Sequence, residues 1–279
     1  KGGQVIIHPT QPGMSAGGDN FTLRDLRAES SGADRRVDVA LQGPNSKNIL
    51  LMLGGSDADK AKVNKLAWAN ITRVNLGGFD LIVSRTGYTG ERVAYEIFPH
   101  PDQAAALFNQ LIALGATPCG LASRDSLRTE AGLPLYGHEL AGDHNLNPAD
   151  AGFGSYVKLW KPYFIGKAAF AAHEQSRDGE VTRFRLVNKG ARPPHPGDPL
   201  VDARGRVVGV VTSCSIDREG YQLGQAFLKD DYLSEGTPLA VFCGSARTNM
   251  NKGFGELKLG DKAPVPEPAA VLSRFPKKS

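Results

Sequence analysis

The sequence predicts an α+β protein, in which an antiparallel sheet carries helices and a small β-barrel follows at the C-terminal end. Apolar and polar residues alternate over residues 37–42, which is typical of a half-buried strand. A helical stripe of apolar residues runs through residues 104–112. Beyond residue 181, short apolar runs are separated by turn signals, which favours a small barrel or sandwich.

The first half of the chain supplies the elements of the predicted sheet domain. Gly43-Pro44-Asn45 turns the chain after the first strand, because proline cannot continue a central strand. The remaining expected elements are a short helix around 46–53, a helix at 60–69, strands at 79–85 and 92–98, and helices at 101–114 and 121–131. This order of strand, helix, hairpin and helix predicts an antiparallel sheet with helices on one face.

The second half of the chain differs from the first in residue composition and in the length of its apolar runs. Residues 143–178 mix glycine, proline, aromatic residues and lysine, so we expect a packed but irregular connector. The expected barrel strands are 181–187, 199–201, 206–212, 222–228 and 238–242. The chain after Lys262 is rich in proline, alanine and lysine, and we expect it to lie on the surface or to fray.

Composition excludes several classes of function. The formal net charge is only +4 and no long Lys/Arg run accompanies it, which argues against nucleic-acid binding. The three cysteines, Cys119, Cys214 and Cys243, lack metal-site spacing and fit a reducing compartment. No apolar run has the length of a membrane span. We therefore expect a cytoplasmic protein, or one from a similarly reducing organelle, without a metal site.

A glycine-bracketed turn, residues 86–91, joins the two strands of the predicted hairpin. Glycine permits positive φ and a close approach of the backbone to a ligand. Tyr88 could stack on a flat heterocycle while a nearby carboxylate binds the edge of that ring. The alternative is an ordinary hairpin in which Tyr88 packs on its own strands.

The predicted helix 121–131 carries two arginines at helical spacing. Arg124 and Arg128 stand at i and i+4, so both guanidinium groups lie on one face and could bind carboxylates. The alternative is a solvated surface with a local Asp125–Arg128 pair, worth about 0.3–0.5 kcal/mol. In the run that follows, residues 132–140, we favour packing of a connector, and His138 is more often structural than catalytic in such a loop.

Taken in order, these segments resemble a known family. The motifs are Gln42-Gly43-Pro44-Asn45, residues 87–91, residues 120–128, Leu135-Tyr136-Gly137-His138-Glu139 and Phe164-Ile165-Gly166-Lys167. Their order and spacing resemble the glycine cleavage T-protein (aminomethyltransferase) family, over about residues 37–245. The run Val208–Ser213 is similar to the family's barrel signature. The resemblance implies a cloverleaf arrangement around a central folate site.

The resemblance also implies roles for individual residues. Tyr88 would lie beside bound tetrahydrofolate, Glu96 would bind the pterin edge, and Arg124 would meet the glutamyl carboxylate. These roles agree with the chemistry, since a pterin offers N–H donors and its tail is anionic. One residue more than the family pattern separates Glu91 from Glu96. An inserted residue reverses side-chain direction unless a bulge absorbs it, so Glu91 is the alternative to Glu96.

The family's catalytic aspartate belongs to an N-terminal part that has no counterpart here, so the catalytic residue is unknown from this sequence. We expect that this part precedes Lys1, or that another chain supplies it, or that the chain binds folate without full catalysis. The expected division is a remnant of the N-terminal folate-binding domain at 1–36, a folate-binding domain at 37–142, a connector at 143–178, a barrel at 179–262 and a tail at 263–279.

The expected activity is transfer of a one-carbon unit to tetrahydrofolate with release of ammonia. A folate nitrogen would attack the methylene of an aminomethyl group carried by a lipoyl carrier protein, the implied partner. One alternative is a folate-dependent demethylase, which the altered barrel run Thr212-Ser213-Cys214 keeps open. The other alternative is a folate-binding module without turnover.

Overall fold

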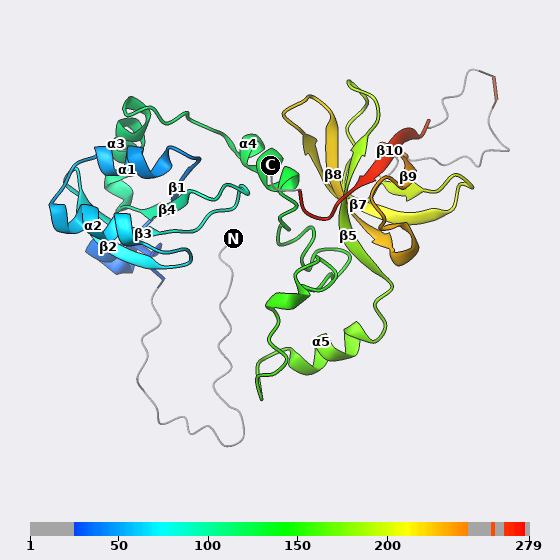
Figure 1. Cartoon of the computed structure of the whole chain (residues 1–279), viewed down its shortest axis with the longest axis horizontal. Helices are drawn as coiled ribbons and strands as arrows, with labels where there is room; N and C mark the ends of the chain where they lie inside the picture. The colour runs from blue at the N-terminus through cyan, green and yellow to red at the C-terminus, as the bar shows by residue number, and fades with distance from the viewer. Residues whose placement is uncertain (1–24, 245–257, 260–264, 277–279) are drawn as a thin grey trace.

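The computed structural model describes residues 25–244, 258–259 and 265–276. Figure 1 shows a sheet domain at one end, a barrel at the other, and helix α4 between them. The predicted α+β fold with a C-terminal barrel is confirmed. Within the described part of the chain, no helix is long and apolar enough to cross a membrane.

The sheet domain has four antiparallel strands in the order β1-β4-β3-β2. Its elements are β1 (Val39–Gln42), α1 (Ser46–Met52), α2 (Asp57–Lys65), β2 (Ile71–Leu76), β3 (Phe79–Ser84), β4 (Ala94–Phe98) and α3 (Pro101–Ala113). The edge strand β2 was not predicted from the sequence. Only its Val74 and Leu76 are buried, so its apolar signal is weak.

The hydrophobic core of this domain lies on one face of the sheet. Leu41 and Ile97 share that core with residues of all three helices, such as Leu50 and Leu107. Successive strand residues point to opposite faces. The residues that alternate with Leu41 and Ile97, Glu96 among them, therefore lie on the face that the helices leave uncovered.

The barrel closes in the antiparallel order β10-β5-β8-β7-β6-β9. Its strands are β5 (Gly179–Leu186), β6 (Pro199–Val201), β7 (Val207–Ile216), β8 (Gln222–Lys229), β9 (Pro238–Val241) and β10 (Glu267–Leu272). The expected C-terminal tail is wrong for β10, which pairs with β5 and β9. Proline and alanine are not typical of a strand, so the sequence did not predict β10, whose Ala269 and Val271 are buried in the barrel.

Helix α4 (Leu121–Glu130) packs against β7 and β8 of the barrel. The connector that follows contains α5 (Lys167–Glu174), where the sequence predicted only irregular structure. Residues 25–36, expected to be irregular, include a 3-10 turn at Glu29–Asp34. Residues 1–24 of that segment lie outside the described residues.

Candidate functional site

The loop that carries Tyr88 is held against three other segments. Gln42 Oε1 accepts hydrogen bonds from the Tyr88 backbone N (3.3 Å) and the Thr89 hydroxyl (2.6 Å). Gly90 has φ +80°, and a Cβ there would lie 2.5 Å from Ala131 Cβ at the end of α4. The Tyr88 hydroxyl donates to the Pro134 carbonyl. Tyr88 thus reaches beyond its own hairpin, and the glycine serves close packing of the loop on the protein itself.

Glu96 lies on the uncovered face of the sheet. In register it pairs with Ala40 of β1 and Ser84 of β3, and the Thr86 hydroxyl donates to Glu96 Oε2. Glu91 instead closes the turn, because its Oε1 accepts the backbone N–H groups of Arg92 (2.7 Å) and Val93 (3.2 Å). The extra residue is therefore absorbed in the loop, and the geometry favours Glu96 over Glu91 as the carboxylate of this face.

A second carboxylate, Asp38, stands on the same face, two residues before Ala40. Burial, and next the neighbouring Glu96 carboxylate, raise the pKa of Asp38, whereas Arg124 lowers it. Arg124 of α4 is therefore near enough to act on this face of the sheet. Burial also raises the pKa of the Tyr88 phenol, while Arg128 and Arg124 oppose that shift. The three predicted residues Tyr88, Glu96 and Arg124 thus belong to one region.

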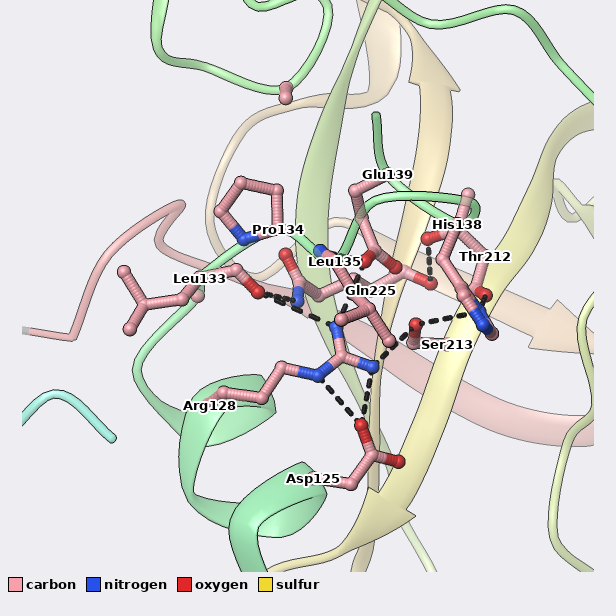
Figure 2. Close-up of polar contacts among 12 residues, drawn as sticks. Asp125, Arg128, Leu133, Pro134, Leu135, His138, Glu139, Thr212, Ser213 and Gln225 are labelled. Atoms are coloured by element: carbon pink, nitrogen blue, oxygen red, sulfur yellow. Dashed lines mark hydrogen bonds and ion pairs between the residues drawn. The ribbon is translucent and has the colours of Figure 1, made fainter. Parts of the chain in front are cut away.

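The two arginines of α4 have different surroundings. Arg124 is exposed, but Arg128 is only 2% exposed. The expected Asp125–Arg128 pair forms, at 2.6 Å, yet the expectation of a solvated surface is wrong for Arg128. The reason is that the last turn of α4 packs on the barrel, where Arg128 Nη2 donates to Ser213 Oγ at 2.8 Å (Figure 2).

Glu139 is the buried counterion of Arg128. Its Oε2 lies 2.9 Å from Arg128 Nη1 and also accepts the Leu135 N–H at 2.9 Å. Next to it, His138 Nδ1 lies 3.0 Å from the Thr212 carbonyl oxygen of β7 (Figure 2). Sequence reasoning treated Glu139 as connector packing. The available signal was a charged residue among apolar neighbours, since a fully buried carboxylate needs a partner.

Two more residues that sequence reasoning missed hold the segment 132–134. Gln225 Nε2 donates to the Leu133 carbonyl (2.9 Å), and Arg274 Nη1 donates to the Gly132 carbonyl (2.7 Å). Burial lowers the pKa of Arg274 to about 10. Gln225 lies on β8 and Arg274 lies two residues after β10, so no local sequence signal connects them with the loop.

One recess of the structure lies elsewhere. It encloses about 380 Å³ and is lined by connector residues, including Leu146, Phe164 and Phe170. Tyr88, Glu96 and Arg124 are not among its lining residues, so they present an open surface and not this recess. Within the described ranges, no group of three His, Cys, Asp or Glu residues is placed to hold a metal ion.

Fold and site together define a protein in which an α+β sheet and an antiparallel barrel are joined through α4 and the segment after it, with polar contacts to both parts. Junctions of this kind often bind small ligands. A model of the GCVT N-terminal domain matches residues 23–161. Aminomethyltransferase from Halothermothrix orenii is 36% identical over 217 residues, 75% of this chain and 57% of that protein. Aminomethyltransferase from Herpetosiphon aurantiacus is 42% identical over 205 residues, 73% of this chain and 54% of that protein.

A solved structure agrees with these relatives. Glycine cleavage system aminomethyltransferase T from Bartonella henselae aligns with a TM-score of 0.66 and 27% identity, over 86% of this chain and 59% of that one. The chain belongs to the glycine cleavage T-protein family. It spans little more than half the length of the two relatives named above.

Proposed function

We propose that this chain contributes the folate-contacting surface of an aminomethyltransferase that transfers a one-carbon unit to tetrahydrofolate. Two folate nitrogens each form a bond to the methylene carbon of an aminomethyl group that is carried on a sulfur atom. The carbon–nitrogen bond to the amine and the carbon–sulfur bond to the carrier break, and the two protons lost by the folate nitrogens leave on ammonia and on the freed thiol. The observation that supports this most is the joint placement of Tyr88, Glu96 and Arg124 at one junction of the fold. The relatives' names support the reaction class.

Each residue suits one part of the ligand. The exposed Arg124 guanidinium can fork onto the glutamyl carboxylate. Glu96 offers acceptor oxygens to the amine and ring N–H groups of the pterin. The Tyr88 ring offers a flat apolar surface, while its hydroxyl is already bound to Pro134. The first two assignments divide the ligand into a tail and a head, and this division can be tested.

Calorimetry with two ligands separates the assignments. Arg124→Gln should weaken tetrahydrofolate binding about 10- to 100-fold, as expected for loss of a charged hydrogen bond of about 1.5–3 kcal/mol. It should leave tetrahydropterin, which lacks the glutamyl tail, unaffected. Glu96→Gln should weaken both ligands.

Arg92→Gln is the matched control, because Arg92 is an exposed arginine of the Tyr88 loop. It removes the same charge without the proposed contact, so tetrahydrofolate affinity should stay within about twofold, the scale of screened surface charges. Equal losses in Arg124→Gln and Arg92→Gln would refute the tail assignment. No binding heat with tetrahydrofolate in the unaltered protein would refute the whole proposal.

The proposed donor is a lipoyl arm on a small carrier protein. Ammonia and methylenetetrahydrofolate should form together when an aminomethyl-loaded carrier is added. Binding of tetrahydrofolate without either product would favour the alternative of a binding module. The demethylase alternative has no support among the relatives, which are named aminomethyltransferases. The three free cysteines support a reducing location such as the cytoplasm.

A further inference from the structure

One peptide unit connects the buried ion pair with Tyr88. The carbonyl of Pro134 accepts the Tyr88 hydroxyl, and the N–H of Leu135, at the other end of the same peptide, donates to Glu139 at 2.9 Å. We propose that Arg128 and Glu139 are a positioning pair, which sets this peptide and through it the ring of Tyr88. The inference rests on the proposed function, in which that ring lies beside folate.

Planarity of the peptide transmits the constraint. The Pro134–Leu135 unit is trans, so its carbonyl and its N–H point in opposite directions and turn together. A rotation that released the Leu135 N–H from Glu139 would swing the Pro134 carbonyl away from Tyr88. The first residue of this unit, Pro134, has no N–H, so it cannot anchor the segment through a backbone donor of its own. Glu139 therefore holds the peptide at the end opposite to Tyr88.

Arg128 fixes Glu139 in turn. The Arg128 guanidinium lies 2.9 Å from Glu139 Oε2 and is itself tied to Asp125 at 2.6 Å and to Ser213 at 2.8 Å. It also donates to the Leu133 carbonyl at 3.4 Å. The pair is thus held from α4 and from the barrel at the same time, as Figure 2 shows.

The same arrangement places Arg124. Arg124 lies one helical turn before Arg128 on α4, and Arg128 anchors that helix to β7 through Ser213. Neither Arg128 nor Glu139 is open to a ligand, because they are 2% and 0% exposed. They act on a ligand only through Tyr88 and Arg124, which makes them positioning residues.

A fluorine label on the Tyr88 ring tests the pair without any ligand. With 3-fluorotyrosine at position 88, Glu139→Gln should shift or broaden the fluorine resonance. Asp198→Asn is the matched control, since Asp198 is an equally buried carboxylate that accepts two backbone N–H groups, of His195 and Gly244, within the barrel. It should leave the resonance unchanged. A resonance that Glu139→Gln does not move would overturn the inference.

A double-mutant cycle in tetrahydrofolate affinity gives the second measurement. Glu139→Gln and Tyr88→Phe should each weaken binding, and together they should weaken it no more than the larger single effect. For one hydrogen bond the expected effect is about tenfold at most. In the control, the fold-losses of affinity caused by Asp198→Asn and by Tyr88→Phe should multiply in the double variant. If the fold-losses caused by Glu139→Gln and Tyr88→Phe also multiply, the inference is overturned.

The two measurements separate this inference from the proposed function. Absence of tetrahydrofolate binding in the unaltered protein would reject the proposed function, while the fluorine comparison would still decide whether Glu139 positions Tyr88. If Glu139→Gln does not fold, Gln225→Leu replaces it, because this change removes no charged side chain. It removes the donor to the Leu133 carbonyl and the acceptor of Arg274 Nη1. A moved resonance in Gln225→Leu supports positioning through this segment, and an unmoved one overturns it.

Discussion

Replacing Arg128 by methionine should cost much of the protein's stability. Arg128 and Glu139 are 2% and 0% exposed, so solvent screens their interaction little. Arg128→Met leaves the Glu139 carboxylate buried with the Leu135 N–H as its donor. Breaking a buried pair from one side typically costs about 3–5 kcal/mol, and we expect a loss in this range. Asp125, which is partly exposed, can be rehydrated and adds little.

The double replacement Arg128→Met with Glu139→Leu should be less harmful than Arg128→Met alone. It removes both charges, so the remaining cost is chiefly the Leu135 N–H without an acceptor, about 1–3 kcal/mol. Urea unfolding followed by circular dichroism, with calorimetry to check that the two domains unfold together, gives these free energies.

The surface pair Arg73–Asp80 provides the control for this experiment. It has the same 2.6 Å contact as Arg128–Asp125, but its arginine side chain is 57% exposed. Arg73→Met should therefore cost under about 1 kcal/mol. The reasoning fails if Arg128→Met costs no more than Arg73→Met. It also fails if the double replacement at Arg128 and Glu139 costs the sum of the two single ones.

Four further substitutions test packing and electrostatics. Gly209→Ala should lower the unfolding free energy by about 2–3 kcal/mol, measured in urea, because its Cβ would collide with the Phe227 carbonyl oxygen in the neighbouring strand. Asp38 has a pKa above its ordinary value of 3.8, so its contribution to stability is complete below pH 3.8 and is lost as the pH rises through the raised pKa. Asp38→Asn should therefore raise the unfolding free energy at neutral pH. Arg124→Gln should raise the Asp38 pKa further and Glu96→Gln should lower it, as followed by carboxyl NMR titration.

Elements with a strong local pattern were predictable from the sequence. Helix α3 has an apolar stripe with proline at its first position, and β6 lies at the predicted residues 199–201. By contrast, β10 pairs only with strands distant in sequence, and its proline argued against a strand. Its place depends on closure of the barrel, which no local pattern of residues 267–272 reveals.

The candidate site was predictable only as residue types. The motifs singled out Tyr88, Glu96 and Arg124, and the structure brings their segments to one region. Which glutamate faces the open side of the sheet depended on where the extra residue is absorbed. That is decided by two hydrogen bonds from the turn to Glu91, so the choice could not be made from the sequence spacing alone.

The two arginines of α4 show why the sequence could not separate binding from positioning. Arg128 donates to four acceptors, namely Asp125, Glu139, Ser213 and the Leu133 carbonyl. A planar guanidinium with five N–H groups can do this, whereas a lysine ammonium has only three N–H donors. In the proposed function, Arg124 offers the same fork to an anionic ligand. Identical side chains one turn apart thus meet two demands, and only the packing of the last turn of α4 on the barrel decides which arginine is buried. The burial of Arg128 therefore supports its proposed positioning role, and the exposure of Arg124 leaves its guanidinium open to the proposed ligand.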